Sequence, residues 1–430
     1  MASKRGTKRA VAKETVAVLG LGYVGLPLAV LLAERGFSVL GLDRDEERVR
    51  AVARGRSPIR HVSSARVRQV LDAGGLEVSA DFSGLRATSV AIICVPTPLT
   101  PQRAPDLSFV EEAARQVVRH ASRGVLVVLQ STTYPGTTRS VVKPILESRG
   151  WKLGKDFDLA FSPEREDLNN PRYSTRNIPK LVGGMDSRSL ERAVALFSAV
   201  VDTVVPVSSC DVAEAAKLLE NIFRSVNIAL VNELKVVFDR MDIDVWEVIE
   251  AAKTKPFGFM TFYPGPGMGG HCIPVDPFYL TWKAREYDLS TKFIELAGEV
   301  NTAMPQFVLE KVRLALNSRQ TSIKGARILV LGVAYKKDVD DVRESPALKL
   351  IEELGRLGAR VSYHDPYVPS LRGRRLKSSA LNEKLVRSSD LVMLITDHSG
   401  VDYGLVRANA RLIVDTRGKW RADQKRIFGA

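Results

Sequence analysis

The sequence has few cysteines: there are three in 430 residues, Cys94, Cys210 and Cys272. They lie far apart, which excludes a disulfide framework and the closely spaced pairs of a zinc site. His271 stands next to Cys272, but no second such pair completes a set of metal ligands. We therefore expect no metal, and this cysteine usage is typical of the reducing cytoplasm.

The sequence also has no long hydrophobic run. None of its apolar segments reaches the roughly 18 residues that a membrane-spanning helix needs. Residues 1–13 are basic, but no apolar segment follows them, so they lack the pattern of a secretory signal and are interpreted as a solvated tail. Hydrophobic residues at 45% and charged residues at 26% are typical of globular proteins. We expect a cytoplasmic protein of two or three domains without a membrane partner.

Acidic residues are the minority among the charges, since 49 of them stand against 63 basic residues and leave a net charge of +14. Such an excess occurs in proteins that bind nucleic acid. Here the basic residues are spread along the chain and accompany no nucleic-acid-binding motif, so we favour an anionic substrate, or merely an arginine-rich composition, as the explanation. The alternative is a non-catalytic basic protein, whose association with nucleic acid would weaken steeply with salt.

The segment near the N-terminus has the pattern of a dinucleotide-binding unit. A β-rich run leads into Gly20-Leu-Gly22-Tyr-Val-Gly25, and a helical segment and a second β-rich run ending at Asp43 follow. In such a unit the first glycine makes the turn, the second lets a pyrophosphate approach, and the third lets the helix pack closely. Asp43 lies 18 positions after Gly25, where a carboxylate can bind ribose hydroxyls. The pattern predicts NAD, although Arg44 beside the acid favours NADP.

Further β-rich runs alternate with helical segments to about Val207, and several end in polar residues. Because ligands bind beyond the carboxyl ends of strands in an open parallel sheet, these residues are expected to share a cleft. Each of them alone could also be a turn or cap residue. The runs are 89–95, 125–129 and 158–161, followed respectively by Thr97, Thr132 and Glu164.

Residues 211–240 contain neither glycine nor proline and predict one helix of roughly 45 Å. Lys217, Asn221 and Arg224 are spaced to share one face of this helix. The helix is apolar enough to be central, so we expect a buried polar site on that face and dimer contacts along the helix. Two more helical segments, 245–252 and 292–317, flank the loop described next.

The stretch 264–277 holds four glycines and four prolines in fourteen residues. This composition predicts a loop with a nearly fixed course and excludes a helix or a central strand. The loop presents Cys272 together with an imidazole and with the carboxylate of Asp276. Two interpretations are open at this point: a thiol held for chemistry, and a buried, inert cysteine.

The last third of the chain predicts a second α/β unit, with β-rich runs at 327–331, 360–364, 391–395 and 412–415 and a helix at 346–357. It has no second glycine-rich dinucleotide pattern, so its ligand must be held in another way. Lys336, Lys337 and Arg343 follow the first run and are available for phosphate. Solvated loop side chains are the alternative.

The chain contains, in order, GLGYVGLP from Gly20, Val95-Pro-Thr-Pro98, Ser131-Thr132, Pro163-Glu164, the helical trio Glu214, Lys217 and Asn221, GGHCIPVDP from Gly269 and AYKKDVDDVRESPA from Ala334. In order, spacing and residue type these motifs resemble the nucleotide-sugar 6-dehydrogenases of the UDP-glucose/GDP-mannose dehydrogenase family. The resemblance covers nearly the whole chain except the basic tail. FSPEREDLNN, and Val275 where the UDP-glucose branch usually has lysine, are most similar to the UDP-N-acetyl-D-glucosamine 6-dehydrogenases.

The resemblance implies an NAD-dependent, four-electron oxidation of the C6 hydroxyl of a UDP-N-acetylhexosamine, with UDP-N-acetylglucosamine favoured, for polysaccharide precursor synthesis. UDP-glucose and UDP-N-acetylmannosamine are alternative substrates. In such a reaction a thiolate adds to the aldehyde formed first, a second oxidation gives a thioester, and water releases the acid. A single-hydride dehydrogenase of the 3-hydroxyacid type is a rival, but it needs no cysteine loop and no C-terminal α/β unit.

The resemblance also implies residue roles. Cys272 would be the nucleophile, and Lys217 and Asn221 would stabilise the oxyanion. Asp276 and Glu164 would order water and move protons with Thr132, and His271 is given a structural role. The expected NAD contacts are Gly20, Gly22, Tyr23, Val24, Gly25, Asp43, Arg48, Thr97, Ser131, Thr132 and Arg343, and the expected substrate contacts are Glu164, Arg165, Lys217, Asn221, Gly269, Gly270 and Lys336.

Patterns and resemblance together predict an α/β fold in which two Rossmann-like doubly wound domains are joined by a long central helix and a small helical domain. After the tail at 1–13, the expected domains are an NAD-binding domain at 14–207, a central helical domain with the cysteine loop at 208–317, and a UDP-sugar-binding α/β domain at 318–430. We expect a homodimer formed through the central helix.

Overall fold

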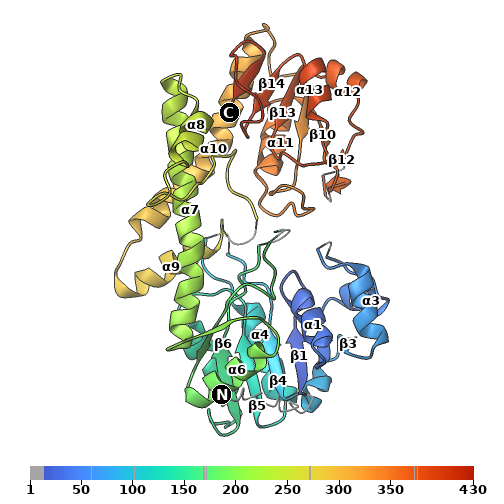
Figure 1. Ribbon diagram of the computed structural model, residues 1–430, viewed down its shortest axis with the longest axis vertical. Coiled ribbons are helices and arrows are strands. Elements are labelled where there is room, and N and C mark those ends of the chain that lie inside the picture. The colour runs from blue at the N-terminus through green and yellow to red at the C-terminus, as the bar shows by residue number, and fades with distance from the viewer. Residues whose placement is uncertain are drawn as a thin grey trace, which may run out of the picture. The chain divides into compact units, whose positions relative to one another are not determined.

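The computed structural model of the protein describes residues 14–59, 61–100, 102–167, 170, 172–270, 273–371, 373–374 and 376–430. The chain divides into two compact units, one up to Leu219 and the other from Glu220 onward. Each unit is built on its own parallel or mostly parallel sheet with helices packed on it (Figure 1). His271, Cys272 and the basic segment 1–13 lie outside the described residues.

The first unit alternates strands and helices along the chain. Its strands are β1 (Thr15–Leu19), β2 (Ser38–Leu42), β3 (Leu76–Ser79), β4 (Val90–Ile93), β5 (Val125–Leu129), β6 (Phe157–Phe161), β7 (Lys180–Gly184) and β8 (Val204–Val207), paired in the order β3-β2-β1-β4-β5-β6-β7-β8. Its helices are α1 (Gly25–Glu34), α2 (Glu46–Ala53), α3 (Ser64–Asp72), η1 (Phe82–Ala87), α4 (Ser108–His120), η2 (Thr138–Val142), α5 (Lys143–Glu147) and α6 (Ser187–Ser198).

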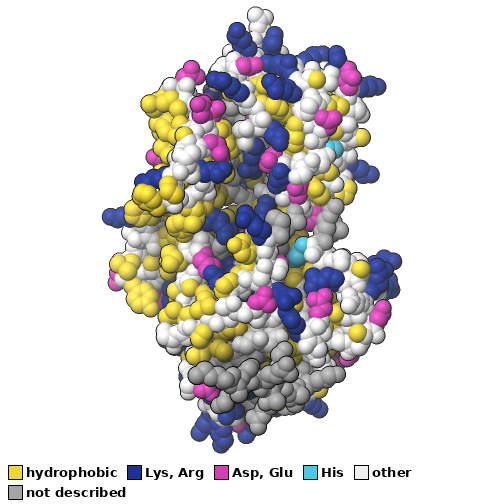
Figure 2. Space-filling model, viewed as in Figure 1, with side chains coloured by type: hydrophobic (Ala, Val, Ile, Leu, Met, Phe, Trp, Pro, Cys, Tyr) yellow, Lys and Arg dark blue, Asp and Glu magenta, His cyan; other side chains and the backbone are white. Residues whose placement is uncertain are grey.

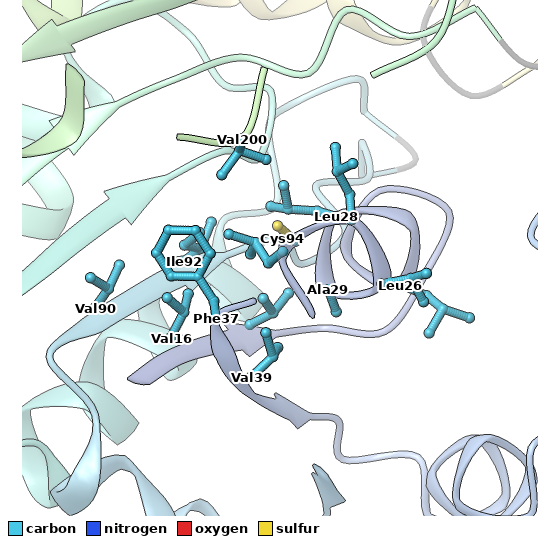
Figure 3. Packing of buried hydrophobic residues seen from close by; sticks show 14 of the residues in the cluster. Val16, Leu26, Leu28, Ala29, Phe37, Val39, Val90, Ile92, Cys94 and Val200 are labelled. Carbon is cyan, nitrogen blue, oxygen red and sulfur yellow. The ribbon is translucent and has the colours of Figure 1, made fainter. Parts of the chain in front are cut away.

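The sheet of the first unit is covered on both faces, because successive strand side chains point to opposite sides. Val16 and Val18 of β1 join a cluster that includes α1, α3 and α6, whereas Ala17 and Leu19 join a second cluster that includes α4 and α5. Figure 3 shows the first cluster, in which side chains of α1 lie against those of β1, β2 and β4. Burial on both faces explains why these strands are continuous apolar runs in the sequence.

Helix α7 (Cys210–Arg240) begins in the first unit and ends in the second, and it is the single long helix that the sequence predicts. Lys217 and Asn221 are buried, but Arg224 is exposed. The prediction that all three share a buried face is therefore wrong for Arg224. Spacing fixes the direction of a side chain from the helix axis, but burial also depends on which element covers the helix at that height.

The second unit combines helices with a smaller sheet. Its helices are α8 (Val245–Ala252), α9 (Asp276–Ala284), η3 (Arg285–Tyr287), α10 (Lys292–Asn317), α11 (Pro346–Arg356), α12 (Glu383–Ser388) and α13 (Tyr403–Asn409). Its strands are β9 (Arg327–Leu331), β10 (Arg360–His364), β13 (Leu391–Leu394), β14 (Ile413–Asp415) and β15 (Ile427–Gly429), with β11 (Ser370–Leu371) and β12 (Leu376–Lys377) forming a separate antiparallel pair. The five-stranded sheet is parallel in the order β10-β9-β13-β14-β15, with α10 and α11 packed on one face and α12 and α13 on the other.

The predicted fold class, two Rossmann-like α/β sheets with a long central helix, is confirmed, and two details differ. Strand β7 is antiparallel to β6, so the larger sheet is mixed. Helix α9 begins at Asp276, inside the stretch that was predicted to contain no helix. Pro277 is compatible with this start because it stands in the first turn, where the N–H that proline lacks would have no partner within the helix.

Gly25 shows how closely α1 packs on the turn after β1. A Cβ at Gly25 would lie 1.8 Å from the carbonyl oxygen of Gly20, whereas a Cβ at Gly22 would meet nothing within 4 Å. A backbone carbonyl cannot rotate away as a side chain can, so the site has no room for alanine.

We predict that Gly25→Ala lowers the free energy of unfolding by about 3 kcal/mol, as overpacking does. The matched control, Gly22→Ala, should change it by less than about 0.5 kcal/mol. Urea denaturation followed by circular dichroism measures both variants. Equal stability of the two would contradict the close packing of α1.

Candidate active site

The glycine-rich turn after β1 fits a dinucleotide. Gly20 has a φ of +97°, and a Cβ there would lie 2.5 Å from the carbonyl oxygen of Cys94, so only glycine suits the position. The space around Gly22 is open, which leaves the backbone at the start of α1 accessible to a pyrophosphate. Val24, the N-cap residue of α1, has no polar side chain to occupy the first N–H groups, and the ring of Tyr23 stacks on that of His61 at 5.9 Å.

Asp43 is buried directly after β2, beside this turn. Its carboxylate accepts the N–H of Leu21 at 2.8 Å and pairs with Nη1 of Arg48 at 2.9 Å. The fixed negative charge suits ribose hydroxyls and repels the additional phosphate of NADP. The guanidinium of Arg44, the residue that favoured NADP, lies 4.4 Å from the ring centre of Phe109 and so has another partner.

Thr97, Ser131 and Thr132 come together at the carboxyl ends of β4 and β5. Thr97 Oγ1 donates to the carbonyl of Thr132 at 2.8 Å, and Ser131 Oγ donates to the carbonyl of Val95 at 2.7 Å. These side chains tie the two loops to each other. Glu164, which follows β6, reaches the same edge through Gln130 Nε2, at 2.9 Å from Glu164 Oε2.

Glu164 is held by donors on both carboxylate oxygens. Oε2 accepts from Lys180 Nζ as well as from Gln130, and Oε1 accepts the N–H groups of Arg165 and Glu166 at 2.8 and 2.9 Å. Burial alone would raise the pKa of Glu164, but the Lys180 ammonium and the backbone donors hold the pKa below its ordinary value. The group is therefore a fixed anion, better suited to orienting water or a hydroxyl than to storing a proton.

Sequence reasoning missed Gln130 and Lys180. Gln130 directly follows β5, so the strand-end argument that selected Thr132 could have found it. Lys180 begins β7, fifteen residues beyond Arg165, and no local pattern marks it. Arg165 itself donates through Nη1 to the carbonyl of Pro179 at 2.8 Å.

A further buried acid, Glu214 of α7, also lies outside the predicted set. Its carboxylate accepts the N–H of Gly136 at 2.6 Å, and the N–H and Oγ1 of Thr138 at 2.9 and 2.6 Å. It thereby ties the helical turn before Lys217 to the loop that carries Thr132. Burial raises the pKa of Glu214 to about 7 despite the three donors. A carboxylate on an apolar helix, three residues before a selected lysine, was a usable signal.

In the second unit, the structure brings Asn221 and Asp276 together. Asn221 Nδ2 donates to Asp276 Oδ2 at 2.6 Å, and both side chains are buried. The bond joins α7 to the first turn of α9, four residues beyond Cys272 in the sequence. Lys217 lies one helical turn before Asn221 and is 8% exposed.

The glycine–proline loop is held by buried hydrogen bonds before it reaches Cys272. The N–H of Gly265 donates to Asn232 Oδ1 at 2.9 Å, and Asn232 Nδ2 donates to Asn301 Oδ1 at 2.8 Å. The N–H of Gly270 donates to the carbonyl of Arg343 at 2.9 Å. The chain on both sides of the two undescribed residues, His271 and Cys272, is thus fixed, with Asp276 as the anchor on the far side.

Gly269 and Gly270 have no room for a side chain. A Cβ at Gly269 would lie 2.7 Å from the Cβ of Tyr335, and one at Gly270 would lie 2.9 Å from its ring. Gly270 also has a φ of +87°. Because glycine has no side chain, the backbone of the loop lies close to Tyr335 at both positions. Packing against Tyr335 therefore helps to fix the N–H groups of Gly269 and Gly270.

The basic residues of the second unit differ in their surroundings. Lys336 is half-buried after β9, and Lys337 is exposed with its Nζ 4.0 Å from Asp397. The guanidinium of Arg343 binds both carboxylate oxygens of Asp341, with Nε at 3.0 Å and Nη2 at 2.6 Å. Asp341 therefore fixes Arg343 in one orientation.

Arg417, which follows β14, is a candidate that sequence reasoning missed. Its Nε donates to the carbonyl of Ile395 at 2.6 Å, and a Cβ at Gly265 would lie 3.0 Å from its Nη1. Burial lowers the pKa of Arg417. A partly buried guanidinium at a strand end is suited to phosphate. Arg417 lies two residues after the end of β14, and a position just after a strand end is the feature by which Thr97 was selected.

Three further properties limit the kinds of site that the described residues can form. They contain no cluster of three or more His, Cys, Asp or Glu side chains that could hold a metal ion. Within the same ranges, every helix is too short or too polar to cross a membrane. Figure 2 shows that Lys and Arg side chains on the visible face are spread out and mixed with acids.

Three domain models of the UDP-glucose/GDP-mannose dehydrogenase family match the chain in succession. The NAD binding domain matches residues 14–201, the central domain 211–303, and the UDP binding domain 329–422. These matches leave the single-hydride hydroxyacid dehydrogenase and the non-catalytic binding protein without support.

Individual relatives match over most of their length. UDP-N-acetyl-D-mannosamine dehydrogenase of Pyrococcus horikoshii is 36% identical over 387 residues, which are 89% of each chain. UDP-N-acetyl-D-glucosamine 6-dehydrogenase of Pseudomonas aeruginosa is 35% identical over 355 residues, 82% of this chain and 83% of the relative. The solved structure of UDP-D-ManNAc dehydrogenase from Pyrococcus horikoshii has a TM-score of 0.86 and 33% identity, covering 95% of this chain and 96% of its own.

We predict that Lys180→Met raises the pKa of Glu164, because it removes the ammonium and leaves burial unopposed. If catalysis needs the Glu164 anion, the acid limb of the kcat/KM profile should move upward by roughly 1 to 3 pH units, and activity should be lost at a higher pH than in the wild type. Lys180→Arg, which keeps the charge, is the matched control. An unchanged acid limb in a folded Lys180→Met enzyme would show that Glu164 does not depend on Lys180.

Proposed function

The chain belongs to the UDP-glucose/GDP-mannose dehydrogenase family, and from this premise we propose that it oxidises the C6 hydroxyl of UDP-N-acetylglucosamine to the acid in a four-electron reaction. That it is an NAD-dependent oxidoreductase follows from the family and its relatives. The observation that carries the finer proposal is the glycine–proline loop, which buried asparagines hold on the way to Cys272 and which ends at Asp276 against Asn221.

The choice of sugar rests on the loop sequence. Val275 stands where the UDP-glucose branch usually has a lysine, and FSPEREDLNN resembles the N-acetylglucosamine branch. Relatives of comparable identity are named for N-acetylmannosamine and N-acetylglucosamine substrates. Initial rates with NAD and a panel of UDP-sugars test the proposal, and a clear preference for UDP-glucose or UDP-N-acetylmannosamine would replace it. The product, a UDP-sugar acid, belongs to the class of precursors used in polysaccharide synthesis. We place the enzyme in the cytoplasm.

The reaction needs a nucleophile between its two oxidations. Loss of a hydride from C6 and of the hydroxyl proton leaves an aldehyde, and a second hydride can leave only after a nucleophile has added. The Cys272 thiolate adds to the aldehyde carbon and forms a thiohemiacetal, the second oxidation gives a thioester, and water displaces the thiolate to release the carboxylate. When bound, NAD supplies the hydride acceptor for each oxidation.

The remaining site residues have roles that match their surroundings. Lys217 and Asn221, one turn apart and buried, offer an ammonium and an amide to the developing oxyanion. Asp276, bound to Asn221, orients water. Glu164 is held ionised by its donors and orients water or the sugar hydroxyl beside Thr132.

The two described cysteines are unsuited to the nucleophilic role. Cys94 and Cys210 are both buried. Burial raises the pKa of Cys94 to about 12 and also raises the pKa of Cys210. Because the thiolate is the nucleophilic form, neither thiol reacts readily at neutral pH. Their environments support the assignment of the chemistry to Cys272.

We propose which ligand each of the domains predicted from the sequence binds. The domain 14–207 holds NAD with the glycine turn, Asp43, Arg48 and the loops that carry Thr97 and Ser131. The domain 208–317 carries the catalytic loop, and Gly269, Gly270 and Arg165 contact the substrate. The domain 318–430 holds the UDP phosphates with Lys336 and, as an addition from the structure, Arg417, while Arg343 contacts the cofactor.

We predict that Cys272→Ser stops the reaction before the acid is released. A hydroxyl of similar size is a poor nucleophile at neutral pH, so acid formation should fall by at least about a hundredfold while NAD affinity is retained. Mass spectrometry of the intact enzyme with UDP-sugar and NAD should detect a covalent sugar adduct on the wild type only. Cys94→Ser is the control and should behave as the wild type, and a Cys272→Ser enzyme that makes acid at the normal rate would remove the covalent mechanism.

We also propose that two copies associate through α7 and its neighbours. Large apolar side chains are exposed on this surface, among them Leu230 at 54% and Phe293 at 78%. Figure 2 shows hydrophobic side chains gathered over α7 and α9. Exposed apolar patches of this kind mark interaction surfaces, and a second copy with the same patch is the partner that the long helix suggests.

We predict that Leu230→Asp converts a dimer to a monomer, because a charge would then be buried without a partner in the interface. Sedimentation equilibrium over a concentration series measures the association. Tyr173→Asp, an exposed aromatic of the first unit, is the control and should leave the dimer intact. A wild type that is monomeric at micromolar concentration would overturn the proposal.

A further inference from the structure

His398 is fully buried behind the turn that carries Lys336 and Lys337. Both of its ring nitrogens have partners. The N–H of Asp338 lies 2.9 Å from Nδ1, and Asp365 Oδ2 lies 3.0 Å from Nε2. Both contacts lie within the second unit.

The two contacts fix the protonation of the ring. A backbone N–H can only donate, so Nδ1 must be the acceptor and carries no proton. The remaining proton of the neutral imidazole is then on Nε2, which donates to the carboxylate of Asp365. This arrangement of bonds exists only while the imidazole is neutral.

Asp365 stands at the position that Asp43 holds in the first unit, directly after the second strand of the sheet. Its Oδ2 also accepts the N–H groups of Val333 and Ala334 at 2.7 and 3.1 Å, and its Oδ1 accepts those of Tyr367 and Val368 at 2.8 and 3.1 Å. These bonds and His398 account for both oxygens, so this acid serves the protein and not a ribose. It anchors His398 whatever ligand is bound.

Side-chain hydrogen bonds of Asp338 to Ser399 and Tyr367 also hold the turn that His398 supports. Asp338 has a φ of +58°, a left-handed conformation that a residue other than glycine adopts at a cost. Its Oδ1 and Oδ2 accept the N–H and Oγ of Ser399, each at 2.7 Å. The backbone bond from Asp338 to His398 holds the peptide two residues after Lys336.

We propose that His398 is a positioning residue for the substrate: its neutral ring holds the Lys336–Asp338 turn in the conformation that presents Lys336 to the UDP phosphates. The inference rests on the proposed function, in which Lys336 is a phosphate ligand. His398 does not touch the substrate and acts through the backbone of Asp338.

Two substitutions separate the two bonds. His398→Asn keeps an acceptor near the position of Nδ1 and loses the donor to Asp365, which retains its four backbone donors. His398→Gln keeps a donor near the position of Nε2 and loses the acceptor for Asp338.

Calorimetric titration of the full-length enzyme with UDP at one pH tests the inference. His398→Gln should weaken UDP binding roughly tenfold, as one lost buried hydrogen bond can. His398→Asn should bind UDP nearly as tightly as the wild type, because its amide oxygen can still accept the Asp338 N–H. Ser399→Ala, which removes an exposed bond to the same turn, should also weaken UDP binding, and NAD affinity should be the same in all the variants.

The outcomes distinguish this inference from the proposed function. If Lys336→Ala leaves UDP affinity unchanged, the assignment of Lys336 fails and the inference fails with it. If Lys336→Ala weakens UDP but His398→Gln does not, only the role of His398 is overturned. A His398→Asn enzyme that binds UDP as weakly as His398→Gln also overturns it, because the acceptor for Asp338 would then not matter.

Discussion

Buried carboxylates that accept backbone N–H groups hold the loops of this protein in place. Asp43 accepts an N–H group of the turn after β1, and Glu164 accepts N–H groups of the segment after β6. Glu214 does the same for the loop after β5, and Asp365 for the loop after β9. Loops at the carboxyl ends of parallel strands carry the ligand-binding groups, but they have few backbone partners of their own. An acid that is itself buried, and bonded to the loop N–H groups, supplies those partners and fixes where each loop runs.

The partner of each acid decides its chemical character. Lys180 keeps Glu164 an anion, and His398 gives Asp365 a neutral donor. Glu214 has only backbone and hydroxyl donors, and burial raises its pKa to about 7. A buried carboxylate bonded to loop N–H groups is therefore a permanent charge at Glu164, and at Glu214 it is a group that titrates near neutral pH. In the second unit the glycine–proline loop is held differently at Gly265, by the uncharged amides of Asn232 and Asn301.

Much of the fold could be predicted from the sequence because its signals are local. Continuous apolar runs marked β1, β5 and β9, and the absence of glycine and proline marked α7. The glycine spacing, followed by Asp43, marked the dinucleotide turn. The antiparallel direction of β7 and the helical start at Asp276 were not predictable, because the first depends on strand pairing and the second on a proline that suits a loop and a first helical turn alike.

Among the site residues, Thr97, Thr132 and Glu164 were selected from their places at strand ends. Lys180 and His398 bond to partners 16 and 60 residues away, and no local pattern records such contacts. Glu214 was marked locally by its place on α7, but its partners in the loop after β5 were not.

The central claim is that one thiol carries the sugar between two oxidations, and the yield of reduced cofactor tests it most directly. A limiting, weighed amount of UDP-N-acetylglucosamine is converted to completion with excess NAD, and the NADH formed is counted by its absorbance against the UDP-sugar acid measured by chromatography. The account predicts two NADH for each UDP-sugar consumed, with the acid as the product. One NADH for each sugar, with the aldehyde as the product, would contradict it.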